Sequence, residues 1–129
     1  MEKTMIQPLT RQTLRGVWAA LIVPWTESNE LDEARFIKEC RSYGDTGVHG
    51  IYTGGTTGEF YAQDDRTFEA ITRIACREGH TANLPVQIGC TTLSTRTARA
   101  RYLWGRSYFP SVKCIPSSQD VRLKTWRPS

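Results

Sequence analysis

Several features that would each define a class of protein are missing from this 129-residue sequence. It has no run of 18 apolar residues, so nothing in it predicts a membrane-spanning helix. Its first fifteen residues are polar and lack the hydrophobic region of a secretory signal, which favours the cytoplasm. Its four cysteines form no C-x-x-C pair, and no Cys and His residues have the spacing of a metal site. We therefore expect free buried thiols, no metal and no cofactor.

Histidine is scarce, and acidic residues almost disappear from the end of the chain. His49 and His80 each stand alone, so neither is expected to carry chemistry. Residues 1–95 hold nine Lys and Arg against twelve Asp and Glu, whereas residues 96–129 hold eight against the single acid Asp120. A change this abrupt indicates two parts of different origin or role.

Three short apolar runs predict buried strands. Residues 17–25 are almost continuously apolar, which is typical of a strand covered on both faces in a parallel sheet. Pro24 ends that run. Residues 48–52 form a second run, and residues 86–88 a third that Gly89 closes. The hydrophobic pattern between these runs changes to a helical period.

Three helices are predicted between and after the strands. The first starts at Asp32, whose charge suits a helix N-terminus, and stops near Gly44 or Gly47. The second starts at Asp64 and ends at Gly79, and the third starts at Thr95 as its cap and reaches Leu103. The expected inward faces are Ala34, Ile37 and Cys40, flanked by Phe36 and Tyr43; then Phe68, Ile71, Ile74 and Ala75; then Ala98 and Tyr102.

Alternating strands and helices predict an α/β fold with a parallel sheet. Two architectures fit that order, a doubly wound open sheet and the start of a (β/α)8 barrel, and periodicity does not separate them. A complete flavodoxin-like sheet needs five strands, whereas only three are visible in the pattern. After residue 102 neither helical nor strand periodicity continues, so residues 103–129 are expected to be an irregular tail with at most one extended piece.

The loop at residues 54–59, Gly-Gly-Thr-Thr-Gly-Glu, comes directly after the second strand. Glycines let the backbone approach a ligand closely, and two threonine hydroxyls beside backbone N–H groups suit a carboxylate. No lysine comes after the last glycine, so this is not a phosphate-binding P-loop, and the dinucleotide spacing G-x-G-x-x-G is absent. The bland alternative is a tight structural turn, in which Glu59 caps the turn after it.

Residues 16–99 resemble the N-terminal part of the dihydrodipicolinate synthase and N-acetylneuraminate lyase family. The resemblance rests on Ala20–Trp25, Gly50–Phe60, the helix with Phe68 and Ile71, and Pro85–Gly89. It implies a TIM barrel that condenses or cleaves a 2-oxo acid, usually pyruvate, through a Schiff base on a lysine. Relatives of full length are commonly homo-oligomers.

The resemblance also implies roles for individual residues of the loop. Thr57 would hold the carboxylate of the 2-oxo acid together with Gly55 and Gly58, and Thr56 would join a proton relay. The sequence departs from the family at Val23, where threonine is common.

The matching region stops before the family's Schiff-base lysine on the sixth strand and its catalytic tyrosines after the fourth and fifth. Lys113, Lys124, Tyr102 and Tyr108 match none of those positions and receive no role. The resemblance therefore implies an incomplete (β/α)8 barrel of three βα units at residues 16–102, inactive alone.

The remainder of the chain flanks that partial barrel as a polar segment at residues 1–15 and a basic tail at residues 103–129. Another reading frame of the gene would explain the tail. A basic binding module at residues 96–129 is the alternative function, with nucleic acid contacting Trp104, Tyr108 and Trp126. A solvated tail is the preferred interpretation, because no nucleic-acid-binding motif accompanies those residues.

Overall fold

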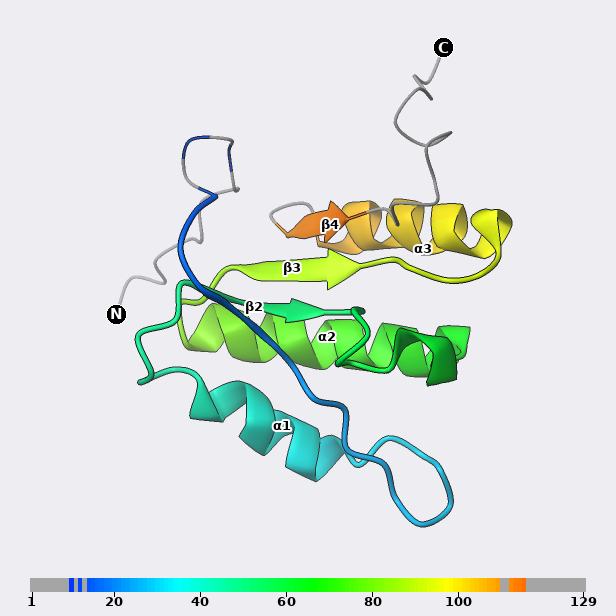
Figure 1. Ribbon diagram of the computed structural model, residues 1–129, viewed down its shortest axis with the longest axis horizontal. Coiled ribbons are helices and arrows are strands. Elements are labelled where there is room, and N and C mark those ends of the chain that lie inside the picture. Colours follow the sequence, from blue (N-terminus) through cyan, green and yellow to red (C-terminus); the bar gives the residue numbers. More distant parts are fainter. Residues whose placement is uncertain (1–9, 11, 13, 110–111, 116–129) are drawn as a thin grey trace.

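The computed structural model describes residues 10, 12, 14–109 and 112–115, in which strands and helices alternate (Figure 1). The four strands are all parallel and lie side by side in chain order, β1-β2-β3-β4. The α/β class with a parallel sheet is confirmed. The elements are β1 (Trp18–Ala20), α1 (Glu33–Ser42), β2 (Gly50–Thr53), the 3-10 helix η1 (Phe60–Ala62), α2 (Asp65–Thr81), β3 (Val86–Gly89), α3 (Thr95–Tyr108) and β4 (Lys113–Ile115).

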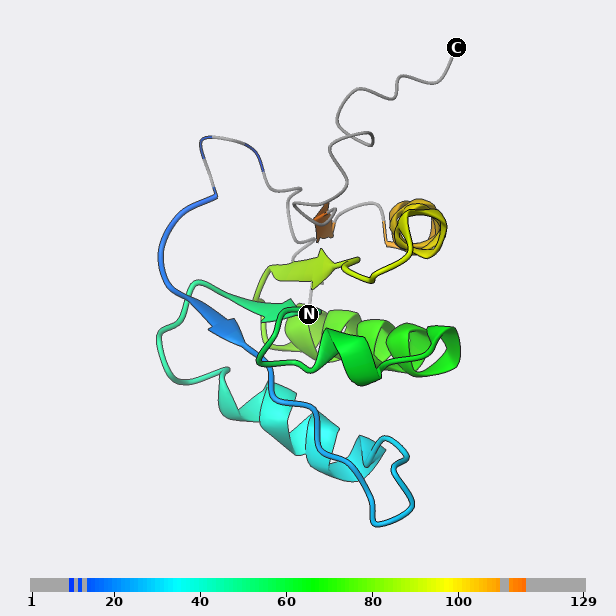
Figure 2. The same ribbon diagram turned by 45° about the vertical axis from the view of Figure 1, so that its right-hand side comes forward.

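All three α-helices lie on one side of the sheet (Figures 1 and 2). Ile51 of β2 and Val86 of β3 point toward α2, where both would contact a Cβ placed on Gly79. The core forms between this face of the sheet and the helices. Its buried apolar residues are Leu21, Val23, Phe36, Cys40, Ile51, Phe68, Ile71, Ile74, Ala75, Cys76, Leu84, Val86, Ile88 and Cys90.

Each helix begins at a side chain that accepts a backbone hydrogen bond. Asp32 accepts from the Arg35 N–H at 3.1 Å, and Asp64 accepts from the Thr67 N–H at 2.8 Å, so the first two predicted starts are confirmed. The third cap is Ser94, not Thr95. Serine and threonine can both cap a helix, so the residue types alone do not distinguish Ser94 from Thr95.

The inward face of α2 is confirmed, since Phe68, Ile71, Ile74 and Ala75 are all buried. The face of α1 is rotated from the prediction: Phe36 and Cys40 are buried, whereas Ala34 is exposed and Ile37 is half-buried. Phe36 is the largest apolar side chain of that helix, and the helix turns to bury it rather than the smaller alanine.

The predicted end of α2 at Gly79 is wrong, because the helix continues to Thr81. A Cβ on Gly79 would lie 2.4 Å from Val86 Cγ2, so this glycine permits close contact between helix and sheet. The predicted first strand is shorter than its apolar run, since β1 covers only Trp18–Ala20. Leu21 and Val23 beyond it are still buried.

The expectation of irregular chain from residue 103 is wrong for residues 103–108, because helix α3 runs on to Tyr108. Residues 113–115 form β4, which pairs with β3 and is the one extended piece that the expectation allowed. Trp104 explains the longer helix, because its ring packs edge-on against Phe68 at 5.9 Å and Phe109 at 5.8 Å. A single large aromatic anchors this turn without producing a periodic pattern. The rest of the tail, with Lys124 and Trp126, and nearly all of segment 1–15 lie outside the described residues.

No helix among the described residues combines the length and apolar character needed to cross a membrane.

Candidate functional site

The Gly-Thr loop, residues 54–59, leaves the carboxyl end of β2 and lies against the carboxyl end of β3. Gly54 has a φ of +80°, and a Cβ there would lie 2.1 Å from the Gly89 carbonyl oxygen. Only glycine meets both demands, the positive φ and the close approach. The loop thus sits where parallel α/β sheets place their ligands, beyond the carboxyl ends of the strands.

Two backbone hydrogen bonds fold the loop into successive turns. The Glu59 N–H donates to the Thr56 carbonyl at 3.0 Å, and the Phe60 N–H donates to the Gly55 carbonyl at 3.3 Å. Thr56 and Thr57 lie at the exposed apex. Neither hydroxyl hydrogen-bonds to another described residue, so both can accept or donate to a ligand.

Glu59 does not cap the turn after it, which corrects that alternative. It adopts a left-handed backbone with a φ of +52°, and its side chain makes no capping bond. Instead, Glu59 Oε2 accepts a hydrogen bond from the indole Nε1–H of Trp25, in the segment after β1. This bond links the end of the loop to the segment that connects β1 with α1.

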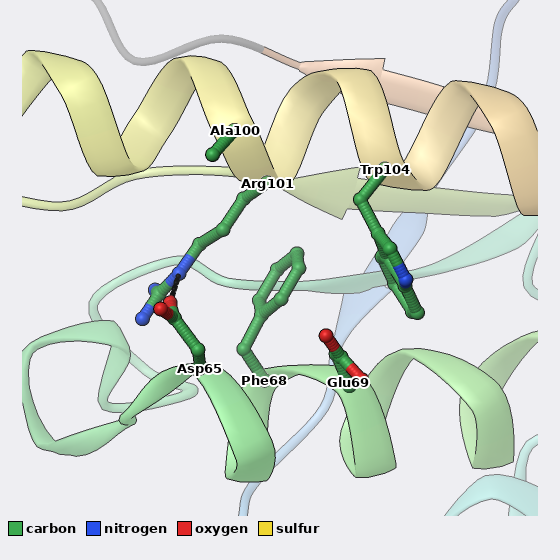
Figure 3. A pocket seen from close by; sticks show the side chains of 6 residues that line it. All are labelled: Asp65, Phe68, Glu69, Ala100, Arg101 and Trp104. Carbon is green, nitrogen blue, oxygen red and sulfur yellow. Dashed lines mark hydrogen bonds and ion pairs between the residues drawn. The ribbon is translucent and has the colours of Figure 1, made fainter.

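The loop is also supported from α3, through two side chains. Gln63 Nε2 donates to the Gly58 carbonyl at 2.7 Å, and Arg101 of α3 donates to the Gln63 carbonyl at 2.9 Å. Arg101 is buried and pairs with Asp65 at 2.9 Å (Figure 3). The ends of the loop are therefore held by side-chain hydrogen bonds, whereas Thr56 and Thr57 at its apex are exposed.

That ion pair lines a cavity of about 280 Å³ between α2 and α3. Figure 3 shows the ring of Phe68 between the Arg101–Asp65 pair and Trp104, with Glu69 beside it. Arg101 also lies over the Phe68 ring, 4.8 Å from its centroid. The cavity lies on the side of the sheet that the helices cover. Arg101, one member of its ion pair, is also the residue that donates to the Gln63 carbonyl and so supports the loop.

Tyr52 lies against the loop and was not singled out by the sequence analysis. A Cβ on Gly89 would lie 2.9 Å from its hydroxyl, and a Cβ on Gly55 would lie 2.7 Å from its ring, so the side chain rests along the base of the loop. Burial, and then the nearby Cys90 thiol, raise the pKa of Tyr52, so its phenol stays protonated at neutral pH. The only signal in the sequence was its place at the end of a short apolar run, two residues before the Gly-Thr loop.

Gly55, Thr56, Thr57 and Gly58 follow one another in this turn, and the structure brings no described lysine side chain to them. Lys38 is the only lysine within residues 13–102, and it lies on the exposed side of α1. Lys113 lies in β4, and Lys124 is outside the described residues.

His49 hydrogen-bonds to the backbone, and the described cysteines are buried. His49 Nδ1 accepts a hydrogen bond from the Val17 N–H at 2.9 Å. Cys40, Cys76 and Cys90 are buried and form no disulfide, as predicted for them, whereas the side chain of Cys114 is not described. Burial, followed by Glu78 and Glu39, raises the pKa of Cys40 to about 12. Within the described part of the chain, no three His, Cys, Asp or Glu residues gather as metal ligands would.

Trp104 and Tyr108, two of the aromatic residues that could have contacted nucleic acid, pack against other residues of the fold. Trp104 packs on Phe68, and the Arg73 guanidinium lies 5.3 Å from the centroids of both the Trp104 and Tyr108 rings. Trp104 is therefore not free to stack on a base, and Trp126 lies outside the described residues. The structure gives the alternative no support.

Comparisons with known proteins agree on one family. Residues 13–102 match the Dihydrodipicolinate synthetase family. A protein of Rhizobium meliloti described as an uncharacterized DapA-like lyase is 31% identical over 90 residues, which are 70% of this chain and 30% of that protein. An N-acetylneuraminate lyase of Escherichia coli O1:K1 is 32% identical over 80 residues, or 61% of this chain and 27% of the enzyme.

A solved structure shows the same fold. YagE of E. coli K12, a prophage protein of the dihydrodipicolinic acid synthase family crystallised with pyruvate, superposes with a TM-score of 0.67 at 21% identity. The superposition covers 73% of this chain and 31% of YagE. The chain thus spans about 30% of the length of the curated relatives that it matches.

Proposed function

Because this chain belongs to the dihydrodipicolinate synthetase family, we propose that its Gly-Thr loop forms the carboxylate-binding wall of a 2-oxo acid site. Thr57 would bind the carboxylate with the backbone of Gly55 and Gly58, and Thr56 would pass a proton. The observation that carries the proposal is the pair of free threonine hydroxyls on a loop anchored from Trp25, Gly89 and Arg101.

The reaction that this wall serves is Schiff-base chemistry on a small 2-oxo acid such as pyruvate. A lysine amine adds to the oxo carbon and water leaves, which turns that carbon into an electron sink for making or breaking the adjacent bond. A fixed carboxylate places the carbon beside the amine, and such positioning contributes much of the rate. The pyruvate in the YagE structure supports this choice of acid.

We further propose that the chain is a partial barrel, inactive by itself. The family match ends at residue 102, and Lys38, the only lysine within it, lies on the exposed side of α1. The amine must then come from outside the matching region. The second substrate and the direction of reaction depend on the same missing parts.

Pyruvate binding tests the first half of the proposal. We expect pyruvate to shift the amide NMR signals of Thr56 and Thr57, and Thr57→Val to weaken binding about tenfold or more, because a hydrogen bond to a charged group contributes about 1.5–3 kcal/mol. Thr46→Val is the control, since Thr46 precedes β2 at the opposite end of the strand. Unmoved loop signals at saturating pyruvate would refute the site.

Borohydride trapping tests the second half. With pyruvate and borohydride, we expect intact-mass measurement to show unmodified chain, because Lys38, the one lysine side chain that the structure describes, lies on the exposed side of α1. A pyruvyl adduct on any lysine would overturn the claim of inactivity and leave the binding claim intact.

A further inference from the structure

Tyr52 lies on the face of the sheet that points away from the helices. Ile51 and Val86 point toward α2, so Tyr52 and Gln87, which alternate with them along β2 and β3, lie on the opposite face. Tyr52 pairs with Gln87 in the register of the sheet, whereas its hydroxyl would lie 2.9 Å from a Cβ on Gly89, two residues further along β3. The side chain therefore leans toward the carboxyl ends of the strands, where the Gly-Thr loop lies.

Two glycines leave the space that this phenol occupies. A Cβ on Gly55 would lie 2.7 Å from the Tyr52 ring and 3.4 Å from its hydroxyl, and a Cβ on Gly89 would lie close to the same hydroxyl. A side chain at either position would displace the phenol. Gly55 belongs to the loop and directly precedes Thr56, so the hydroxyl lies beside the backbone that we propose binds a carboxylate.

The Tyr52 hydroxyl is available to a ligand. It forms no hydrogen bond to another described residue. Among the described side chains, the buried polar atom that lacks a partner is Thr72 Oγ1, so the hydroxyl of the half-buried Tyr52 still contacts solvent. The raised pKa of this phenol keeps its proton in place at neutral pH. An accessible O–H donor thus lies beside the loop, and such a group normally finds a partner.

We propose that Tyr52 makes this site selective for oxo acids, because its hydroxyl donates a hydrogen bond to the oxo oxygen of the bound acid. The inference rests on the proposed function, in which Thr57 and the backbone of Gly55 and Gly58 bind the carboxylate. The oxo oxygen is attached to the carbon next to that carboxylate. Its donor must therefore lie beside the carboxylate-binding backbone, which is where the Tyr52 hydroxyl lies. A site that hydrogen-bonds one group of its ligand discriminates against an analogue that lacks the group.

A packing role for the ring is the alternative. The ring would then fill the space over the two glycines, and its hydroxyl would contribute nothing to binding. Phenylalanine fills that space equally well and lacks the donor. Tyr52→Phe therefore separates the two roles without opening a cavity.

NMR titration of the full 129-residue chain with two acids tests the inference. Propanoate has the carboxylate and methyl group of pyruvate but a methylene in place of the oxo group. We expect pyruvate to bind more tightly than propanoate. Tyr52→Phe should weaken pyruvate binding about three- to tenfold and leave propanoate binding unchanged, since one neutral hydrogen bond is lost. Thr57→Val should weaken both acids, because both carry the carboxylate.

The matched control is Tyr61→Phe, at a residue of η1 that is 66% exposed, and it should change neither affinity. A second measurement follows the phenol directly. In a chain labelled isotopically at tyrosine Cζ, pyruvate should shift the Tyr52 signal, which is assigned by its absence in Tyr52→Phe, and propanoate should not. Thermal melts of Tyr52→Phe should coincide with those of the parent chain, because the hydroxyl has no partner among the described residues.

The outcomes distinguish this inference from the proposed function. Equal affinities of the parent chain for the two acids, an unchanged pyruvate affinity in Tyr52→Phe, equal weakening of both acids, or a lowered melting temperature would each overturn the role of Tyr52 and leave the loop site intact. If neither acid moved the amide signals of Thr56 and Thr57, the proposed function would be overturned, and the inference with it.

Discussion

Two glycines with the same positive φ allow the effect of φ to be separated from the effect of space. Gly47 and Gly54 both have a φ of +80°. A Cβ on Gly47 would meet nothing within 4 Å, whereas a Cβ on Gly54 would lie 2.1 Å from the Gly89 carbonyl oxygen. Replacing each with alanine therefore imposes the same backbone penalty, and only one of them adds a collision.

The magnitudes come from that difference. Gly47→Ala should destabilise the fold by about 1–2 kcal/mol, the usual penalty for an L-residue in the left-handed region. Gly54→Ala should cost at least about 2 kcal/mol more, because the overlap is with backbone and must separate the ends of β2 and β3. Neither change removes a side-chain contact, so the comparison isolates the clash.

Urea denaturation followed by circular dichroism measures both variants. The midpoint should fall much further for Gly54→Ala than for Gly47→Ala, with similar slopes. In the folded Gly54→Ala chain, we also expect shifted amide signals at Thr56 and Thr57 and weaker pyruvate binding. Equal losses of stability for the two variants would refute the close packing of Gly54 against Gly89.

Three further predictions concern the supports of the loop and the buried thiol. In a double-mutant cycle, Trp25→Phe and Glu59→Ala should show a coupling of about 1–2 kcal/mol, because the indole donates to a charged acceptor; additive losses in urea melts would contradict the bond. Arg101→Met should cost about 1–3 kcal/mol, since it leaves the buried Gln63 carbonyl without its donor, whereas the exposed Arg96→Met on the same helix should stay within about 0.5 kcal/mol. Thermal melts of the two variants that coincide would rule out this role. Finally, the pKa of Cys40 rises from 9.0 to about 12 on folding, so the unfolded chain binds fewer protons between these values and stability falls as pH rises. Cys40 should contribute at most about 1.4 kcal/mol per pH unit to this slope, so the fall in stability should be less steep in Cys40→Ala; parallel pH profiles for the two chains would contradict the shift.

Local patterns were reliable where a segment contributes one regular face to the core. The four predicted inward residues of α2 are buried, because a long amphipathic helix has a single way to cover apolar side chains. The pattern was less reliable for α1, where Ala34 and Phe36 competed for the core and volume decided. It failed after residue 102, where Trp104 anchors the end of α3 through contacts with Phe68 and Phe109.

For the candidate site too, some features could be predicted from the sequence and others could not. Its position beyond the carboxyl end of β2 could be inferred from a glycine-rich loop after a buried strand. The supports could not, because Trp25 and Glu59 are 34 residues apart, and Arg101 and Gln63 are 38 apart. No local period encodes such pairs. Tyr52 was missed for the same reason, since its contacts with Gly55 and Gly89 exist only after two strands align.

The sequence by itself determined the alternation of strands and helices, the place of the Gly-Thr loop and the family, since these depend on residue type and short spacing. Only the tertiary structure decided which side chains hold the loop, which face of the sheet the helices cover and that a fourth strand continues its order. These properties arise from contacts between distant segments, whose energies depend on relative positions that the linear order of residues does not display.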